Sequence, residues 1–319
     1  MRSEPDVSKP ETLEASTLRL SKAELKRTSN RKSSSGGLVF KVLRLSLAGL
    51  QVLAPTTTVK LVAGLFRTPL PTKLSHRKSK LPAGVRLERL VFENATLTLY
   101  FYPAAEQAPQ ILLTHGWAGY GMQMAELADV LSQQGWAVVV IDQPGHGRSA
   151  GWTSNLQQFS RALSLVGTRL HRLEAIIGHS MGAAAATHAV VNGLAIKKLA
   201  LLAAPVSLTQ ETRSMALALG LSEATLQATI ALIEAREAVP FATVEASYLA
   251  PKIKAPTLVI HDLEDRVVPY SAAQTLIAYL PAPSLYTTTG LGHRRLLKEP
   301  EVIQQISQFL GSPSPASQI

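Results

Sequence analysis

The segment Ile176–Ala186, read IIGHSMGAAAA, contains the residues best suited to chemistry. Ser180 lies between Gly178 and Gly182, directly after an apolar run and before four alanines. A serine hydroxyl is a weak nucleophile alone and needs an adjacent base. Ser180 is therefore a candidate nucleophile, provided that other segments supply a base and an acid.

Later segments supply both groups. Asp265 follows the apolar run TLVI, and His293 follows SLYTTT. A histidine can take the serine proton and return it to a leaving group, and an aspartate can orient the imidazole and stabilise its charged form. Asp262 and Glu264 compete with Asp265 for the role of the acid. No further His or carboxylate clusters with His261 and Asp262, so we expect no metal and no cofactor.

These side chains need a scaffold that brings distant strand ends together. From residue 85 onward, short apolar runs alternate with helical patterns, which predicts an α/β fold with a mostly parallel sheet and helices on both faces. VRLERLVF and TLTLYFYP predict an N-terminal β-hairpin that turns at Glu93 and Asn94. Helices are expected near residues 122–134, 155–171, 180–193, 271–280 and 298–310. Ligands bind at the carboxyl ends of parallel strands, where the candidate residues all fall.

One interval breaks this alternation. About 45 residues separate Pro205 from Pro251, too many for a simple connection, and they are helix-prone. We interpret residues 206–250 as a helical insertion, or lid, over one end of the sheet. Its leucines suit an apolar acyl group, although core packing explains them equally well.

The ordered motifs resemble those of the α/β-hydrolase superfamily. GHSMG matches the G-x-S-x-G nucleophile elbow, and the order Ser180, Asp265, His293 matches its triad. HGWAG, DQPGHGRS, DRVVP and GLGH are similar to its loops, and the resemblance spans residues 85–310. It implies a strained turn at Ser180 and an oxyanion hole formed by the backbone N–H groups of Trp117 and Met181.

We expect supporting roles for other polar residues. His115 would hold the oxyanion loop by hydrogen bonds. The resemblance implies that the side chain of His179 points away from the reacting centre. His146 and Arg148 would stabilise the loop DQPGHGRS, and Asp142 would anchor it.

A serine nucleophile points to acyl transfer to water. The first hypothesis is a carboxylesterase or lipase-like serine hydrolase that works through an acyl-enzyme. The alternatives are an aminopeptidase, amidase or thioesterase of the same fold. An aminopeptidase would need carboxylates near the substrate amine, for which Glu211, Glu234 and Glu237 are available. An alternative of another class is a catalytically silent binding domain that associates with membranes.

Charge and composition divide the 319-residue chain. The net charge is +10, with +11 in residues 1–80 and −1 in the rest, and cysteine is absent. We expect a disordered basic tail at 1–37, an amphipathic helical region at 38–80 and the hydrolase domain at 81–319. No signal peptide or spanning helix is evident, which favours a cytoplasmic location.

The region 38–80 is predicted to form two helices, the first stopped by Pro55. Lys41, Arg44, Ala48 and Gln51 share one face of the first helix. Both helices either pack on the main domain or contact an anionic membrane peripherally. Nucleic acid is not expected as a partner, because the region has few aromatic residues.

Overall fold

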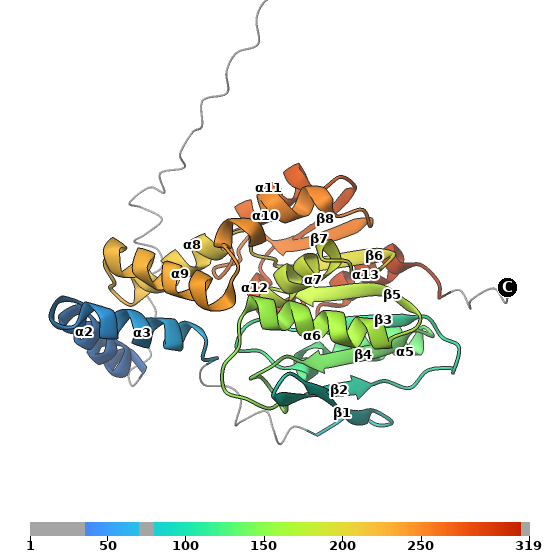
Figure 1. Cartoon of the computed structure of the whole chain (residues 1–319). Helices are drawn as coiled ribbons and strands as arrows, with labels where there is room; N and C mark the ends of the chain where they lie inside the picture. Colours follow the sequence, from blue (N-terminus) through green and yellow to red (C-terminus); the bar gives the residue numbers. More distant parts are fainter. Residues whose placement is uncertain (1–35, 70–79, 314–319) are drawn as a thin grey trace, which may run out of the picture. The chain divides into compact units, whose positions relative to one another are not determined.

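The computed structural model describes residues 36–69 and 80–313, and an eight-stranded sheet forms its centre (Figure 1). The spatial order is β1-β2-β4-β3-β5-β6-β7-β8. The strands are β1 (Arg86–Phe92), β2 (Ala95–Phe101), β3 (Gln110–Thr114), β4 (Ala137–Asp142), β5 (Leu173–His179), β6 (Lys198–Leu202), β7 (Thr257–Asp262) and β8 (Pro283–Thr288). β2 pairs antiparallel with β1 and β4, and the pairs from β4 to β8 are parallel, which confirms the expected sheet.

The predicted hairpin is present. Phe92 pairs with Ala95, and Glu93 adopts a positive φ of 50° in the turn between them. Most of the expected tail, residues 1–35, lies outside the described residues, and α2 begins at Gly36. Within the described part of the chain, no helix combines the length and apolar character that crossing a membrane requires.

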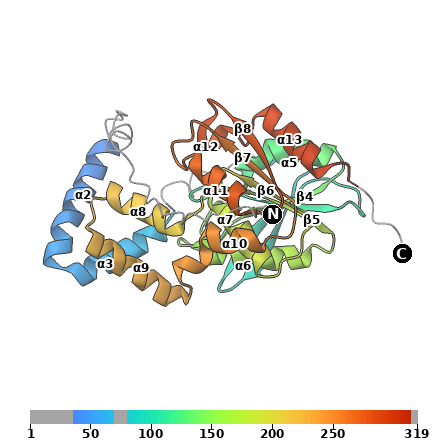
Figure 2. The ribbon, with the colours of Figure 1, turned by 90° about the horizontal axis from the view of Figure 1, so that it is seen from above.

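Helices cover both faces of the sheet (Figure 2). Those of the main domain are η1 (Gly121–Met124), α5 (Ala125–Gln133), α6 (Leu156–Arg169), α7 (Met181–Val191), α10 (Ala246–Leu249), η3 (Ala250–Lys252), α11 (Ser271–Tyr279), α12 (Gly292–Arg295) and α13 (Pro300–Leu310). Each helix expected from the sequence in this domain is found within a few residues of its predicted bounds. The remaining helices are α2 (Gly36–Leu53), α3 (Pro55–Phe66), α8 (Leu208–Ala218), α9 (Glu223–Glu237) and η2 (Phe241–Val244).

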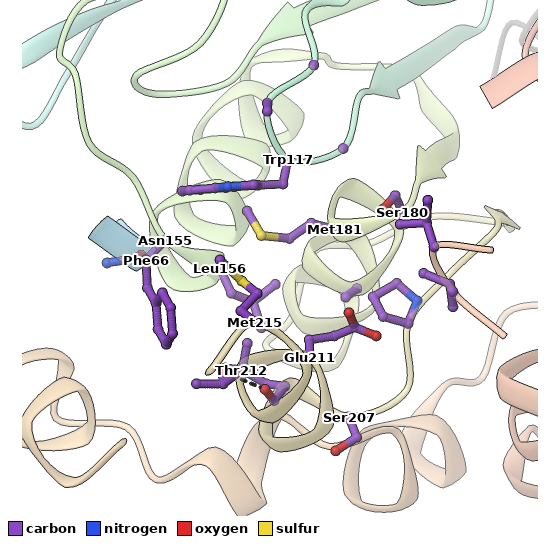
Figure 3. A pocket seen from close by; sticks show the side chains of 18 of the residues that line it. Phe66, Trp117, Asn155, Leu156, Ser180, Met181, Ser207, Glu211, Thr212 and Met215 are labelled. Carbon is purple, nitrogen blue, oxygen red and sulfur yellow. Dashed lines mark hydrogen bonds between the residues drawn. The ribbon is translucent and has the colours of Figure 1, made fainter. Parts of the chain in front are cut away.

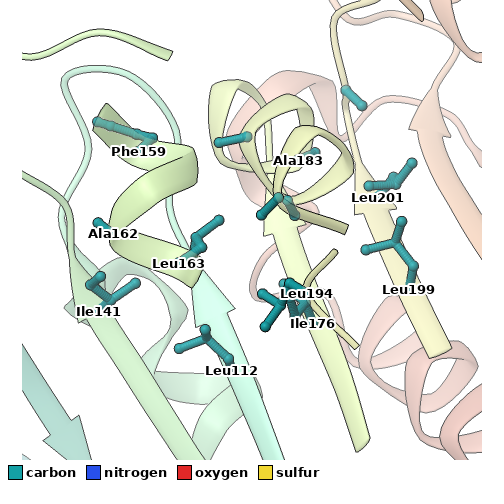
Figure 4. Packing of buried hydrophobic residues seen from close by; sticks show 14 of the residues in the cluster. Leu112, Ile141, Phe159, Ala162, Leu163, Ile176, Ala183, Leu194, Leu199 and Leu201 are labelled. Carbon is teal, nitrogen blue, oxygen red and sulfur yellow. The ribbon is translucent and has the colours of Figure 1, made fainter. Parts of the chain in front are cut away.

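Two apolar layers hold the sheet between its helices, because successive strand side chains point to opposite faces. On one face, Ile176 packs with Phe159 and Leu163 of α6 and with Ala183 of α7 (Figure 4). On the other face, Ile177 belongs to the layer that contains residues of α5 and α13. Complete burial of both faces explains why the parallel strands read as continuous apolar runs rather than alternating ones.

Helices α2, α3, α8 and α9 share a separate apolar cluster, and we call these four helices the helical subdomain. Its buried members are Leu47, Val62, Ala216, Leu219, Leu221, Leu226, Ile230 and Phe241. The N-terminal helices and the insertion of residues 206–250 are thus packed together, although residue 206 follows Phe66, the last residue of α3, by 140 positions in the sequence. Pro55 does not lie between two helices but occupies the first turn of α3, where its missing N–H would have no partner in any case.

Candidate active site

Ser180 occupies the junction of β5 and α7 in a strained conformation. Its φ is 53° and its ψ is −126°, a backbone conformation that residues other than glycine rarely adopt. A Cβ on Gly178 would lie 2.6 Å from the Cα of Ala183, and one on Gly116 would lie 2.7 Å from the Cβ of Ser180. A Cβ on Gly182 would overlap the carbonyl oxygen of His115. The glycines therefore allow strand, helix and neighbouring loop to meet at the serine.

The structure brings together the three residues expected to form the triad. Ser180 Oγ lies 3.0 Å from His293 Nε2, and His293 Nδ1 lies 2.7 Å from Asp265 Oδ2. Ser180 follows β5, Asp265 follows β7 and His293 follows β8, so all three stand at the carboxyl edge of the sheet. This geometry lets His293 accept the serine proton on one nitrogen while the other donates to the aspartate.

Two backbone N–H groups hold the carboxylate of Asp265 in place. Its second carboxylate oxygen, Oδ1, accepts the N–H groups of Val267 at 2.8 Å and Val268 at 3.0 Å. Burial alone would raise the pKa of Asp265, but the hydrogen bond and charge interaction with His293 and these two N–H donors hold it below its usual value. Asp265 is therefore an anion that can stabilise a protonated imidazole.

Asp262 and Glu264, the other candidates for the acid that orients His293, have different surroundings. Asp262 accepts hydrogen bonds from Thr288 Oγ1 at 2.7 Å and from the N–H of Leu291 at 3.0 Å, so it holds the loop that leads to His293. Glu264 is exposed to solvent. Neither carboxylate has a hydrogen bond to His293 among the described residues.

His179 does not point away from the reacting centre, contrary to the expectation. Its ring centroid lies 4.8 Å from that of His293, and its Nε2 donates to the carbonyl of His293 at 2.8 Å. Burial lowers the pKa of His179 to about 3, so the ring is neutral. His179 is the last residue of β5, and this bond to the main chain helps to hold the segment that carries His293.

Two backbone N–H groups near Ser180 are available for an oxyanion. Trp117 follows β3, and Met181 is the first residue of α7. Within the described residues, neither N–H donates to another protein group. Ser180 also caps the N-terminus of α7, so the positive end of the helix dipole lies at the serine. Both groups therefore remain candidates for an oxyanion hole.

Histidines hold the loop that carries Trp117. His115 is fully buried, its Nδ1 donates to the carbonyl of Gly116 at 2.8 Å, and its Nε2 accepts the N–H of Gln143 at 3.1 Å. His146 Nε2 accepts the N–H of Ala118 at 3.1 Å. Burial lowers the pKa of His115 and keeps it neutral, as these donor and acceptor roles require.

Asp142 anchors the neighbouring loop, as the sequence suggested. It accepts the N–H groups of Gly121 at 2.6 Å and Arg148 at 2.7 Å and the hydroxyl of Tyr100 at 2.6 Å. Burial and the adjacent Asp142 raise the pKa of the Tyr100 hydroxyl, so it remains a donor. Asp142 therefore has a structural role and no access to the serine.

A cavity of about 620 Å³ opens at Ser180. Trp117 and Met181 lie on one wall, and Glu211, Thr212 and Met215 of α8 lie on the facing wall (Figure 3). Other apolar residues that line it are Phe66, Leu156, Val206, Leu208, Ile233 and Phe241. A largely apolar cavity with a few convergent polar groups is typical of a small-molecule site.

The helical subdomain supplies residues that the sequence analysis did not assign to the site. Phe66 and Arg67, at the end of α3, line the cavity together with residues of α8 and η2. No local signal marks them, because their position depends on packing between α3 and α9. Arg67 Nη2 lies 3.7 Å from Glu237 Oε1, so these two side chains form an ion pair.

Of the three carboxylates considered for amine binding, the structure places only Glu211 on the cavity wall among the described residues. Glu234 instead accepts the N–H of Phe241 at 2.6 Å, and Glu237 pairs with Arg67. Burial raises the pKa of Glu211 to about 7; the nearby His293 lowers it and Asp265 raises it. Glu211 therefore changes charge near neutral pH inside an apolar cavity.

Comparison with known proteins supports the fold. Residues 105–242 match a family model described as serine aminopeptidase, S33. Among curated proteins, none is similar enough in sequence to match the chain.

Several solved structures have the same architecture. A membrane phospholipase A described as a bacterial virulence factor is 22% identical, with a TM-score of 0.55 over 86% of this chain and 96% of that one. A hydrolase from Pseudomonas aeruginosa PA01 is 20% identical, with a TM-score of 0.57 over 72% and 100%. Proline iminopeptidase from Mycobacterium smegmatis is 18% identical, with a TM-score of 0.54 over 70% and 97%. These similarities confirm the α/β-hydrolase fold and leave the substrate open.

Proposed function

We propose that this α/β-hydrolase is a serine hydrolase that cleaves carboxylic esters with an apolar acyl group. The observation that carries the proposal is the continuous hydrogen-bonded series of Ser180, His293 and Asp265 at a largely apolar cavity. The series provides an activated nucleophile, and the cavity provides room for the acyl chain. Helix α8 covers the cavity as a lid in this proposal.

In the first half of the reaction, Ser180 Oγ attacks the ester carbonyl carbon while His293 Nε2 takes the serine proton. The carbonyl oxygen becomes an oxyanion and accepts the N–H groups of Trp117 and Met181. The tetrahedral intermediate then breaks its bond to the alkoxy oxygen, which leaves as an alcohol with the proton from His293. The product is an acyl group bound to Ser180.

In the second half, a water molecule attacks the acyl-enzyme and gives its proton to His293. The new tetrahedral intermediate breaks its bond to Ser180 Oγ, which recovers the proton from His293. The carboxylic acid is released, and the enzyme returns to its starting state. Asp265 remains ionised throughout and stabilises the imidazolium in each half.

A fluorophosphonate probe and a series of p-nitrophenyl esters with increasing chain length test this proposal. We expect covalent labelling of the wild type and ester turnover, and Ser180→Ala should abolish labelling and lower kcat by about 10⁶-fold. Ser207→Ala is the matched control, since Ser207 lines the same cavity but caps α8 instead of contacting a histidine. Absence of labelling and turnover in the folded wild type would favour a silent binding domain.

A second candidate is the hydrolysis of aminoacyl substrates, which Glu211 favours. An ionised carboxylate on the cavity wall could pair with a substrate ammonium, and the matching family model is described as a serine aminopeptidase. Aminoacyl p-nitroanilides and N-blocked versions of the same compounds distinguish the candidates. If aminoacyl hydrolysis is the function, the free amine is preferred and Glu211→Gln removes the preference.

A further inference from the structure

Helix α2 exposes a row of apolar side chains to solvent. Val42, Leu45, Val52 and Leu53 are 55%, 72%, 77% and 85% exposed. Their spacing, with Gly49 between them, places them on one side of the helix. Contiguous exposed apolar surface of this kind marks an interaction site.

The opposite side of α2 is already used, so the exposed row cannot be buried by turning the helix. Leu47 is 6% exposed and belongs to the cluster of the helical subdomain. Gln51 donates to the carbonyl of Gly220 at 3.3 Å and accepts the N–H of Ser222 at 2.9 Å. Gln51 of the polar face noted in the sequence thus contacts residues 220–222, while apolar residues face outward.

The part of the sequence that contains this row is positively charged. Between Leu25 and Leu87 the sequence contains 13 Lys and Arg residues and no Asp or Glu. Lys41 lies one turn before Leu45, and both Lys41 and Lys60 are exposed. An apolar helix face with exposed lysines nearby, in two helices that contain no acidic residue, complements an anionic lipid surface. On such a surface, apolar side chains enter the acyl boundary and cations remain at the headgroups.

Exposed apolar side chains are concentrated in this part of the molecule. Six of the large ones in the described residues lie between Lys41 and Arg67, namely Val42, Leu43, Leu45, Val52, Leu53 and Leu61. The same two helices belong to the subdomain that forms one wall of the cavity. A lipid surface bound there would lie against the part of the protein that also lines the cavity.

We propose that α2 docks on an anionic lipid bilayer, with Val42, Leu45, Val52 and Leu53 inserted at the acyl boundary and nearby Lys and Arg side chains at the phosphate headgroups. The binding is peripheral and reversible. It does not depend on the hydrolytic reaction, so Ser180→Ala binds vesicles as the wild type does. Failure of catalysis and failure of docking are therefore separate results.

Sedimentation of the full chain with vesicles of phosphatidylcholine and phosphatidylglycerol in equal parts tests docking. We expect binding that weakens in high salt and in vesicles of phosphatidylcholine alone. Val52→Ser should lower the partition coefficient about tenfold, since apolar carbon atoms no longer enter the bilayer. Val91→Ser is the matched control, because Val91 on β1 is 73% exposed and should leave binding unchanged. Thermal unfolding verifies that both variants are folded.

Equal binding of Val52→Ser and Val91→Ser would overturn the proposal, as would equal binding to anionic and neutral vesicles. A second copy of the chain is the competing occupant of the α2 face. If the wild type is a dimer without vesicles, and Val52→Ser makes it a monomer with unchanged vesicle binding, the face is a protein interface and the proposal is wrong. A tenfold loss specific to Val52→Ser supports docking.

Discussion

Two carboxylates near His293 differ because their surroundings differ. Asp265 accepts hydrogen bonds from His293 and two backbone N–H groups, which lower its pKa despite burial. Glu211 is also shielded from water, but no hydrogen bond to its carboxyl group is present among the described residues, and its pKa rises to about 7. One carboxylate is thus an anion, and the other titrates near pH 7.

This difference predicts a pH dependence of substrate binding. Because burial raises the pKa of Glu211, its carboxyl group is neutral below about pH 7 and ionised above it. We expect KM for a neutral, long-chain ester to rise about fivefold between roughly pH 6 and pH 8, since the ionised group disfavours an apolar ligand. In Glu211→Gln the KM should be nearly constant. Steady-state kinetics across this range measure both.

The control for this prediction is Glu264→Gln, because Glu264 is an exposed carboxylate close to the site in sequence. The KM of Glu264→Gln should change with pH as that of the wild type does. A wild-type KM that does not change with pH, or an unchanged slope in Glu211→Gln, would contradict the role assigned to Glu211.

At the scale of elements, the elbow is a junction of three backbone segments. The end of β5, the start of α7 and the loop after β3 approach one another at Gly178, Gly182 and Gly116. Ser180 is exposed to the cavity only because these segments are so close. The small residues are therefore steric requirements of the position of Ser180, and Ala183 extends the same close packing into the helix.

Gly182→Ala should reduce both stability and activity. The added methyl group would overlap the carbonyl oxygen of His115 and lie 2.8 Å from that of Thr114. We expect a loss of about 1–3 kcal/mol in the free energy of unfolding and a lower kcat, because the displaced loop carries Trp117. Urea unfolding and ester kinetics provide the two measurements.

Gly64→Ala serves as the comparison within a helix. No atom lies within 4 Å of the position of its added Cβ, and alanine has the higher helix propensity, so this variant should be slightly more stable than the wild type. Similar destabilisation by both substitutions would show that close packing at the elbow is not the cause.

At the scale of the molecule, the sheet carries the candidate catalytic residues and the helical subdomain completes the cavity. Ser180, Asp265 and His293 lie in segments that follow β5, β7 and β8. The facing wall comes from α3, α8, α9 and η2, whose cluster is smaller than either layer of the sheet. A smaller cluster provides less apolar burial, so this part should open at lower free energy than the sheet.

Leu226→Ala should loosen the subdomain and leave the sheet intact. Leu226 is 2% exposed in the cluster, and its truncation costs about 2–5 kcal/mol locally. Hydrogen exchange should accelerate in α3, α8 and α9 but not in β3 to β7. The kcat/KM for long-chain esters should fall, and that for acetyl esters should change little. Leu217→Ala, at an exposed position of α8, should change neither.

The sequence by itself determined the sheet, the hairpin and the residues that now surround Ser180. These features depend on local patterns: apolar runs of strand length, glycines two positions from a serine, and polar residues directly after strands. Because parallel strands place their carboxyl ends at one edge, such patterns also predict which distant residues meet.

Only the tertiary structure decided the cavity wall that faces Ser180. Phe66, Glu211 and the exposed face of α2 depend on how residues 41–67 pack against residues 208–241. Leu47 and Leu45 are equally apolar in sequence, yet one is buried and the other exposed. The sequence of a helix determines that an apolar face exists, but the partner that covers it is chosen by side-chain packing between remote segments, which no local pattern records.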